Sequence, residues 1–305
     1  MIATSKLFVF LTGKSYRYRG LLSAAALILV IGLNAACTSE PPPAASPPPP
    51  LKFSSQTYKE VVELNIEGID AKPQMAISLE LIDLPEVPES SNAELRRTVR
   101  QFLRRNLYGG KEPGDYAKAI IDDLRTNYLK QTEIVKENPN LALAASMNWE
   151  YLEKVEVETL PEGAQNWVFS QSLYQIAGGA HGSSSKRYFV AGETGTDPLK
   201  VENFIQGGVE STALNALLTQ ALRRAKGLSD NTPLSQGGFF EDKVETPENF
   251  FISPDGIGFH WDPIQIAPYS EGQIEAVIPY AELADILTDQ GRSLVAEPPA
   301  PPTAE

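Results

Sequence analysis

Histidine and cysteine, on which much enzyme and metal chemistry depends, are almost missing from this chain. Its 305 residues include two histidines, His181 and His260, and one cysteine, Cys37. A catalytic zinc site uses about three protein ligands, and no His-Glu-x-x-His motif supplies two of them here. A zinc site therefore requires that the fold bring both histidines and a carboxylate together. A single cysteine also excludes a disulfide within the chain.

Motifs of common hydrolases and nucleotide-binding proteins are missing as well. There is no Gly-x-Ser-x-Gly, although Ser183, Ser184 and Ser185 follow soon after His181. The Gly-Gly-Ala-His-Gly loop lacks the Gly-Lys-Ser/Thr ending of a phosphate loop. Acidic residues are plentiful enough for a paired-carboxylate glycosidase, but no motif marks such a pair. The sequence names no catalytic residue, no metal and no cofactor, and it favours a binding module over an enzyme.

Positive charge is in short supply. Aspartate and glutamate total 39 against 26 lysines and arginines, a formal net charge of −13. Binding to nucleic acid or to anionic lipid by charge needs a basic surface. We therefore expect no nucleic-acid partner, and any membrane attachment must come from something other than electrostatics.

A long apolar run occurs once, from Leu21 to Leu33. It is shorter than the roughly 20 residues that span a bilayer. The charged residues before it are all basic: Lys6, Lys14, Arg17 and Arg19. A basic start, a short apolar region and small residues before a cut are typical of an export signal.

The end of this signal resembles that of bacterial lipoproteins, in which small residues precede a cysteine. Ala35 and Ala36 precede Cys37, although Asn34 stands where leucine is usual. The resemblance implies lipid attachment at Cys37 and a membrane-anchored protein facing the periplasm or the cell surface. The alternatives are an ordinary cleaved signal and a retained helix.

Proline dominates the next segment and returns at the end of the chain. Residues 38–52 contain one proline cluster, and residues 296–305 contain another. Proline lacks an amide donor and fixes φ, so such segments favour extended chain over a packed core. The expected organisation has five parts: a signal over 1–37, a tether over 38–52, a companion region over 53–145, a C-terminal domain over 146–295 and a disordered tail over 296–305.

In the companion region, residues 58–70 and 76–85 have the composition of strands. Ser91 and Glu94 form a helix-capping signature, and a second helical pattern covers 117–128. Arginines crowd the first helix: Arg96, Arg97, Arg100, Arg104 and Arg105. Two interpretations stay open for them, pairing with carboxylates of the same protein or binding of a phosphate or acidic glycan.

The C-terminal region reads as strands over 148–158 and 166–177, another strand after the His181 loop, and a helix with an apolar stripe over 214–225. Further short strands follow from Asn249, and a short helix starts near Tyr280. Strands and helices occur in blocks, which favours an α+β fold. We expect an antiparallel sheet packed by a few amphipathic helices.

The loop that contains His181 is the candidate ligand site. Gly178, Gly179 and Gly182 surround the histidine, and Tyr174 lies on the preceding strand. Glycine permits positive φ and close backbone approach. The loop fits a ligand contact or a turn with a solvated histidine, while catalysis by His181 is the third interpretation. For His260, in an alternating apolar segment, we expect a packed or edge-strand position.

Residues 149–287 resemble domain of unknown function 3298. The resemblance rests on the Gly-Gly-Ala-His-Gly loop, the long helix and the final block with Ala267-Pro268-Tyr269 and Ile278-Pro279-Tyr280. This domain occurs in RsiV-type anti-sigma factors, where it senses the outside and binds lysozyme, and ahead of the catalytic domain in some peptidoglycan deacetylases. About 20 residues precede the apolar run here, too few for a sigma-binding domain, and no deacetylase domain is expected.

The resemblance implies an exported binding module of the cell envelope. Its partner would be a cell-wall glycan or an envelope protein such as a lysozyme-like muramidase. Two alternatives remain: a cell-wall hydrolase that uses His181 or acidic residues, and a purely structural envelope lipoprotein.

Overall fold

The computed structural model describes residues 51–68, 70, 72–87, 92–137, 140–158, 160, 166–178 and 181–295. The predicted signal with Cys37, nearly all of the tether, the tail over 296–305, Ser91 and Gly179 lie outside these residues. The described residues group into one compact unit. None of the helices in the described ranges has the length and apolar character to cross a membrane.

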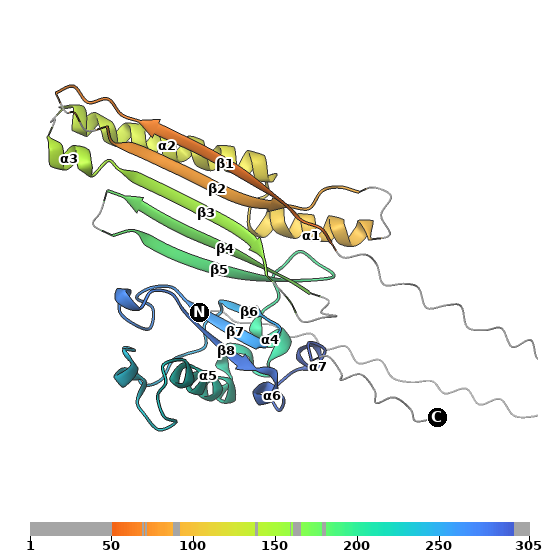
Figure 1. The fold of residues 1–305 in the computed structure, drawn as a ribbon. Helices are drawn as coiled ribbons and strands as arrows, with labels where there is room; N and C mark the ends of the chain where they lie inside the picture. Colours follow the sequence, from red (N-terminus) through yellow and green to blue (C-terminus); the bar gives the residue numbers. More distant parts are fainter. Residues whose placement is uncertain are drawn as a thin grey trace, which may run out of the picture. The chain divides into compact units, whose positions relative to one another are not determined.

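A five-stranded sheet contains strands from both predicted folded regions (Figure 1). Its strands follow one another in chain order: β1 (Ser54–Glu63), β2 (Gln74–Asp83), β3 (Trp149–Val157), β4 (Asn166–Ala177) and β5 (Ser183–Gly192). The expectation of an antiparallel sheet is wrong at one place, because β2 and β3 are parallel. Parallel neighbours need a long crossover, and the helical segment between these strands provides it.

Helices α1 (Ala93–Asn106) and α2 (Pro113–Glu137) lie along one face of this sheet, and α3 (Leu141–Ala145) lies at its end (Figure 1). The predicted cap at Ser91 is shifted, since the residue that precedes α1 is Asn92. Alternation along β2 turns Ile77, Leu79 and Leu81 toward the helices, where all three are buried. The face of the sheet and the apolar stripes of the helices thus form the first core.

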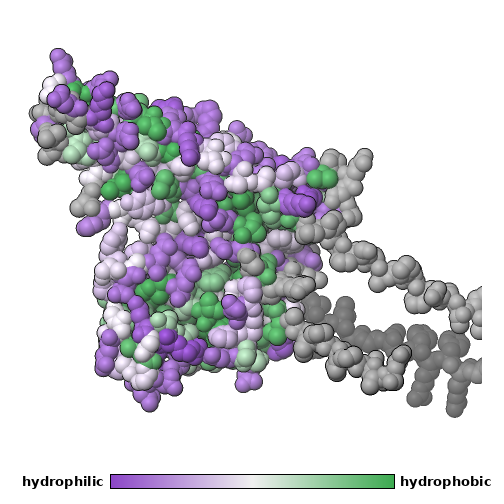
Figure 2. Space-filling view, in the orientation of Figure 1, coloured by the Kyte–Doolittle hydropathy of each residue, from purple (hydrophilic) through white to green (hydrophobic). Residues whose placement is uncertain are grey.

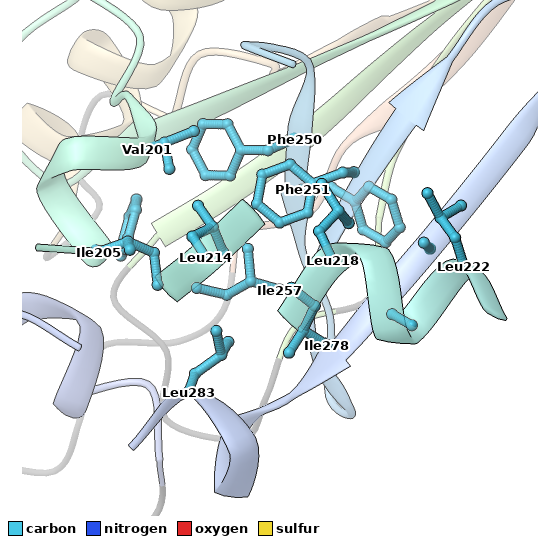
Figure 3. Close-up of a cluster of buried hydrophobic side chains, with 14 of the residues drawn as sticks. Val201, Ile205, Leu214, Leu218, Leu222, Phe250, Phe251, Ile257, Ile278 and Leu283 are labelled. Carbon is cyan, nitrogen blue, oxygen red and sulfur yellow. The ribbon is translucent and has the colours of Figure 1, made fainter. Parts of the chain in front are cut away.

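A second core surrounds a three-stranded antiparallel sheet of β6 (Phe250–Ile252), β7 (Gly256–Trp261) and β8 (Ile274–Pro279). Helix α5 (Thr212–Ala225) packs on it, with Leu214, Leu218 and Leu222 among the side chains of the strands (Figure 3). The remaining helical turns are α4 (Val201–Phe204), η1 (Gly208–Glu210), η2 (Leu234–Gly237), η3 (Tyr269–Glu271), α6 (Tyr280–Leu283) and α7 (Asp289–Arg292).

The two sheets are joined through β5. The side chain of Asn249 accepts a hydrogen bond from the amide of Tyr188 at 2.9 Å and donates one to the carbonyl of Lys186 at 2.7 Å. Val168 and Val190, on β4 and β5, are buried in the second core. One face of the large sheet therefore supports the small sheet near β5, and this junction positions the candidate site.

Candidate binding surface beside the His181 loop

Two glycines of the predicted loop stand where no side chain fits. Gly178 has φ 77°, and a Cβ there would lie 2.3 Å from the carbonyl oxygen of Ser146. A Cβ at Gly182 would lie 2.5 Å from the hydroxyl of Tyr174. Of the predicted site residues that the structure describes, Gly182 and Tyr174 are therefore in direct contact, and the loop is shaped by close packing.

His181 is exposed at the start of the return into β5. Its ring lies 5.8 Å from the ring of Tyr269, measured between centroids. The hydroxyl of Tyr269 donates a hydrogen bond to the carbonyl of Gly182 at 2.7 Å. Within the described part of the chain, no hydrogen bond or ion pair orients the imidazole of His181. Such a partner normally holds a catalytic base in place.

Tyr269 brings a second set of exposed side chains close to the loop. Phe240 is 54% exposed, Ile264 is 62% exposed and Tyr269 is 46% exposed. The amide of Phe240 donates to the carbonyl of Ile266 at 2.9 Å, which places Phe240 beside the segment that carries the other two. We call His181, Phe240, Ile264 and Tyr269 the loop surface.

Ile264 has an unusual backbone conformation. It is the single residue other than glycine with positive φ, at 74°, among those that the structure describes. It occupies the third position of a turn in which the amide of Gln265 donates to the carbonyl of Asp262 at 3.2 Å. Glycine is the usual residue there, and a β-branched residue at positive φ is a genuine outlier. Strain of this kind costs about 1–3 kcal/mol and gathers at functional sites.

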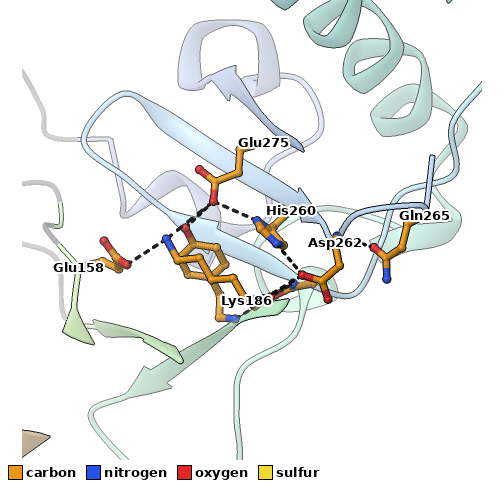
Figure 4. Close-up of polar contacts among 8 residues, drawn as sticks. Glu158, Lys186, His260, Asp262, Gln265 and Glu275 are labelled. Carbon is orange, nitrogen blue, oxygen red and sulfur yellow. Dashed lines mark hydrogen bonds and ion pairs between the residues drawn. The ribbon is translucent and has the colours of Figure 1, made fainter. Parts of the chain in front are cut away.

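A buried histidine, His260, contacts Asp262, the first residue of this turn. The His260 side chain is fully buried in β7, which confirms its expected packed position. Figure 4 shows it between two carboxylates. Its Nδ1 lies 3.0 Å from Oε1 of Glu275 and its Nε2 lies 3.1 Å from Oδ1 of Asp262. Since neutral imidazole has one N–H donor, both contacts are hydrogen bonds to carboxylates only when both nitrogens carry protons.

Strand β5 is tied to the same carboxylates. The amide of Lys186 donates to Oδ1 of Asp262 at 2.8 Å, and the hydroxyl of Tyr188 donates to Oε1 of Glu275 at 2.8 Å. The hydrogen bond from His260 is the largest cause that lowers the pKa of Glu275, and the hydroxyl of Tyr188 and the charge of Lys186 lower it further. This network fixes Asp262, the first residue of the strained turn, and so positions Ile264.

A buried carboxylate, Glu153 on β3, lies under the helices. It accepts hydrogen bonds from the hydroxyls of Tyr116 at 2.8 Å and Tyr151 at 2.9 Å and from the amide of Gln171 at 2.6 Å. Burial, and next the charge of Glu153, raise the pKa of both tyrosines, which keeps them donors at neutral pH. Because its partners are so complete, Glu153 is a structural link between α2, β3 and β4.

The described residues contain no group of three histidine, cysteine or acidic side chains placed to hold a metal ion. His181 is exposed and His260 is enclosed by two carboxylates and Tyr188. The two histidines therefore have different surroundings and do not form the joint site that zinc would need.

Comparison with known proteins finds a family model that matches the part of the chain around the small sheet. Residues 203–281 match the model of a family described as protein of unknown function, DUF3298. We call residues 203–281 the DUF3298 domain, after the family whose model they match. It lies within the 149–287 segment that the sequence resemblance covered. A comparison with curated proteins finds no match to the chain.

Solved structures extend the likeness in fold beyond the DUF3298 domain itself. A member of the DUF3298 family from Bacteroides fragilis superposes with a TM-score of 0.64 at 21% identity, over 80% of this chain and 96% of that one. A DUF3298 family protein from Pseudomonas aeruginosa PAO1 gives 0.53 at 15% identity, over 79% and 96%. At these identities the likeness concerns the fold alone. It shows that proteins of the DUF3298 family share the α+β architecture of this chain.

The DUF3298 domain contains Phe240, Ile264 and Tyr269, whereas His181 lies before it. The sequence pointed to His181, Tyr174 and their glycines but missed Phe240 and Ile264. Tyr269 drew notice only as part of the family block. The loop surface thus forms where the DUF3298 domain meets the β4–β5 connection, through the bond from Tyr269 to Gly182.

Proposed function

We propose that this protein is an exported, lipid-anchored binding module of the cell envelope, and that it contacts its partner through the loop surface. The partner is an envelope protein such as a muramidase. A cell-wall glycan is the competing partner that the experiment below separates.

The observation that carries this proposal is the exposed side chain of Ile264 on a strained backbone. It is 62% exposed at φ 74°, so the folded chain bears a conformational cost for a side chain that its own core does not bury. A glycine would remove that cost. In a complex, this side chain would pack against an apolar surface of the partner. Residues with a strained backbone often occur at binding sites.

The chemistry of the neighbouring side chains favours a protein partner. Tyrosine and phenylalanine are enriched at the centres of protein interfaces, where they supply large contact area. Much of the face drawn in Figure 2 is hydrophilic, with hydrophobic residues in separate patches. Phe240, Ile264 and Tyr269 are exposed on adjoining segments and supply contact area of this kind.

The envelope location rests on the sequence. The basic start, the short apolar run and Cys37 support export and lipid attachment, and the proline-rich residues 38–52 then serve as a tether. Stable anchoring needs more than one acyl chain, since a single chain gives only marginal binding. Replacing Cys37 with Ala should release the protein from membranes, and a variant that stays bound with its N-terminus intact contradicts the anchor.

Binding is tested by pull-down of the mature protein on immobilised lysozyme and on purified peptidoglycan. Ile264→Ser should lose lysozyme binding. The matched control is Val61→Ser on β1, since Val61 is also β-branched and is 57% exposed. Loss with Ile264→Ser alone supports the proposal. Equal binding by both variants refutes the surface, and retention on peptidoglycan alone replaces the protein partner with a glycan.

A further inference from the structure

Helix α1 carries an arginine at three successive turns of one face. Arg96, Arg100 and Arg104 are spaced by four residues, and they line a cavity of about 330 Å³. Glu86, Val87, Ala93, Arg97 and Gln101 complete its lining. This volume lies at the lower end of the range for ligand pockets, about 300–1,000 Å³.

Carboxylates offset only part of the positive charge. Arg100 pairs with Glu86, and Arg104 pairs with Glu112, whose other oxygen lies 3.6 Å from Arg100. With Arg97, the cavity has four guanidinium groups against two carboxylates, a surplus of 4 − 2 = 2 positive charges. The chain as a whole has a net charge of −13, so the positive charge of this cavity is the opposite of the charge of the whole protein.

Donors remain unused in the cavity wall. Nε of Arg100 is buried and has no hydrogen-bond acceptor. Arg97 is exposed and makes no ion pair or hydrogen bond within the described part of the chain. An unmet buried donor costs about 1–3 kcal/mol, and like charges four residues apart on a helix repel. An anion in the cavity would relieve the repulsion among the arginines that line it.

We infer that this cavity binds the phosphate group of a small ligand, either free phosphate or a phosphorylated sugar. Guanidinium donors match phosphate oxygens in pairs. Three arginines at four-residue spacing extend over about 12 Å of helix, and the two surplus charges match a phosphate dianion better than a single carboxylate. The cavity uses α1 and the chain after β2, none of it from the loop surface, so the inference goes beyond the proposed function.

The test is calorimetric titration of the full mature chain with inorganic phosphate and, separately, with glucose 1-phosphate, at constant ionic strength set by chloride. Arg97→Gln should weaken binding about tenfold or more, the scale of a lost charge-assisted hydrogen bond. Arg97 is exposed, so this variant should keep its fold. Arg187→Gln is the control, because Arg187 is also exposed, lies on β5 and is not part of the cavity lining.

A second variant should change the affinity for phosphate in the opposite direction. Glu86→Gln removes a competing carboxylate from Arg100 and should tighten phosphate binding several-fold. If the sugar phosphate binds more tightly than inorganic phosphate, the ligand is a phosphorylated sugar, and the reverse order assigns free phosphate. An absence of saturable binding by the parent overturns the inference, and so does equal weakening by Arg97→Gln and Arg187→Gln.

Discussion

Replacement of Ile264 by glycine and by alanine separates backbone strain from side-chain contacts. Both substitutions remove nearly the same exposed side chain, but only alanine keeps a Cβ at φ 74°. At an ordinary helical or strand position, glycine is less stable than alanine by about 0.5–1 kcal/mol, because it gains more freedom in the unfolded chain. At position 264 we expect the order to reverse.

The size of the reversal follows from two opposing contributions. A Cβ in the left-handed region costs about 1–2 kcal/mol, and the unfolded-state freedom of glycine returns about 0.5–1 kcal/mol. Ile264→Gly should therefore be more stable than Ile264→Ala by about 0.5–1 kcal/mol. The buried part of the isoleucine side chain does not enter this comparison, because both variants lose it.

Urea melts of the two variants, with equal slopes, measure the difference in free energy of unfolding. Alanine more stable than glycine by about 0.5–1 kcal/mol would show ordinary backbone at this position. The strain argument, and with it the main support for the loop surface, would then fail. Lysozyme binding should fall in both variants alike, since both lose the isoleucine side chain.

Three further predictions concern the framework of the fold. Leu218 is fully buried beneath β6–β8, so Leu218→Ala should lower the free energy of unfolding by about 2–5 kcal/mol. A denaturant melt that shows almost no change would mean that this face of α5 is exposed to solvent. Gly178→Ala should destabilise by more than about 1 kcal/mol, because its Cβ would meet the Ser146 carbonyl at φ 77°, and unchanged melting would contradict that close approach. The hydrogen bond from His260 keeps the pKa of Glu275 below its ordinary 4.5, so its charge stabilises the fold above that pH and loses this effect as the pH falls through the lower folded-state value. Melts of Glu275→Gln and the parent should differ at neutral pH and converge in acid, and a constant gap would refute the coupling.

The sequence predicted the elements that depend on local pattern. The alternation of β3 and the leucine stripe of α5 were readable because each of these elements has one buried face. The parallel pairing of β2 with β3 was not readable, since it depends on how the chain crosses over by way of α1 and α2. The mixed pairing of the sheet therefore depends on contacts between residues that are far apart in the sequence.

The candidate site was only half predictable for the same reason. The glycines beside His181 are local signals, but Tyr269 reaches that loop, and Phe240 reaches the segment around Ile266, through contacts between distant segments. The strain at Ile264 has no local sign, because Asp-Pro-Ile-Gln does not contain the glycine that normally marks such a turn. Glu153 did leave a signal: it stands between Tyr151 and Val155 on the apolar face of β3, where an acidic residue must find buried donors.

The dissociation constant of lysozyme for the mature protein and for Tyr269→Ala tests the binding surface most directly. Tyr269 is nearly half exposed, holds the Gly182 carbonyl and faces His181. A tyrosine at the centre of an interface contributes about 2 kcal/mol or more on truncation, so the constant should rise about 30-fold, while Val61→Ala leaves it unchanged. A Tyr269→Ala protein that is still folded and binds as tightly as the parent, or a parent that does not bind, would contradict the account.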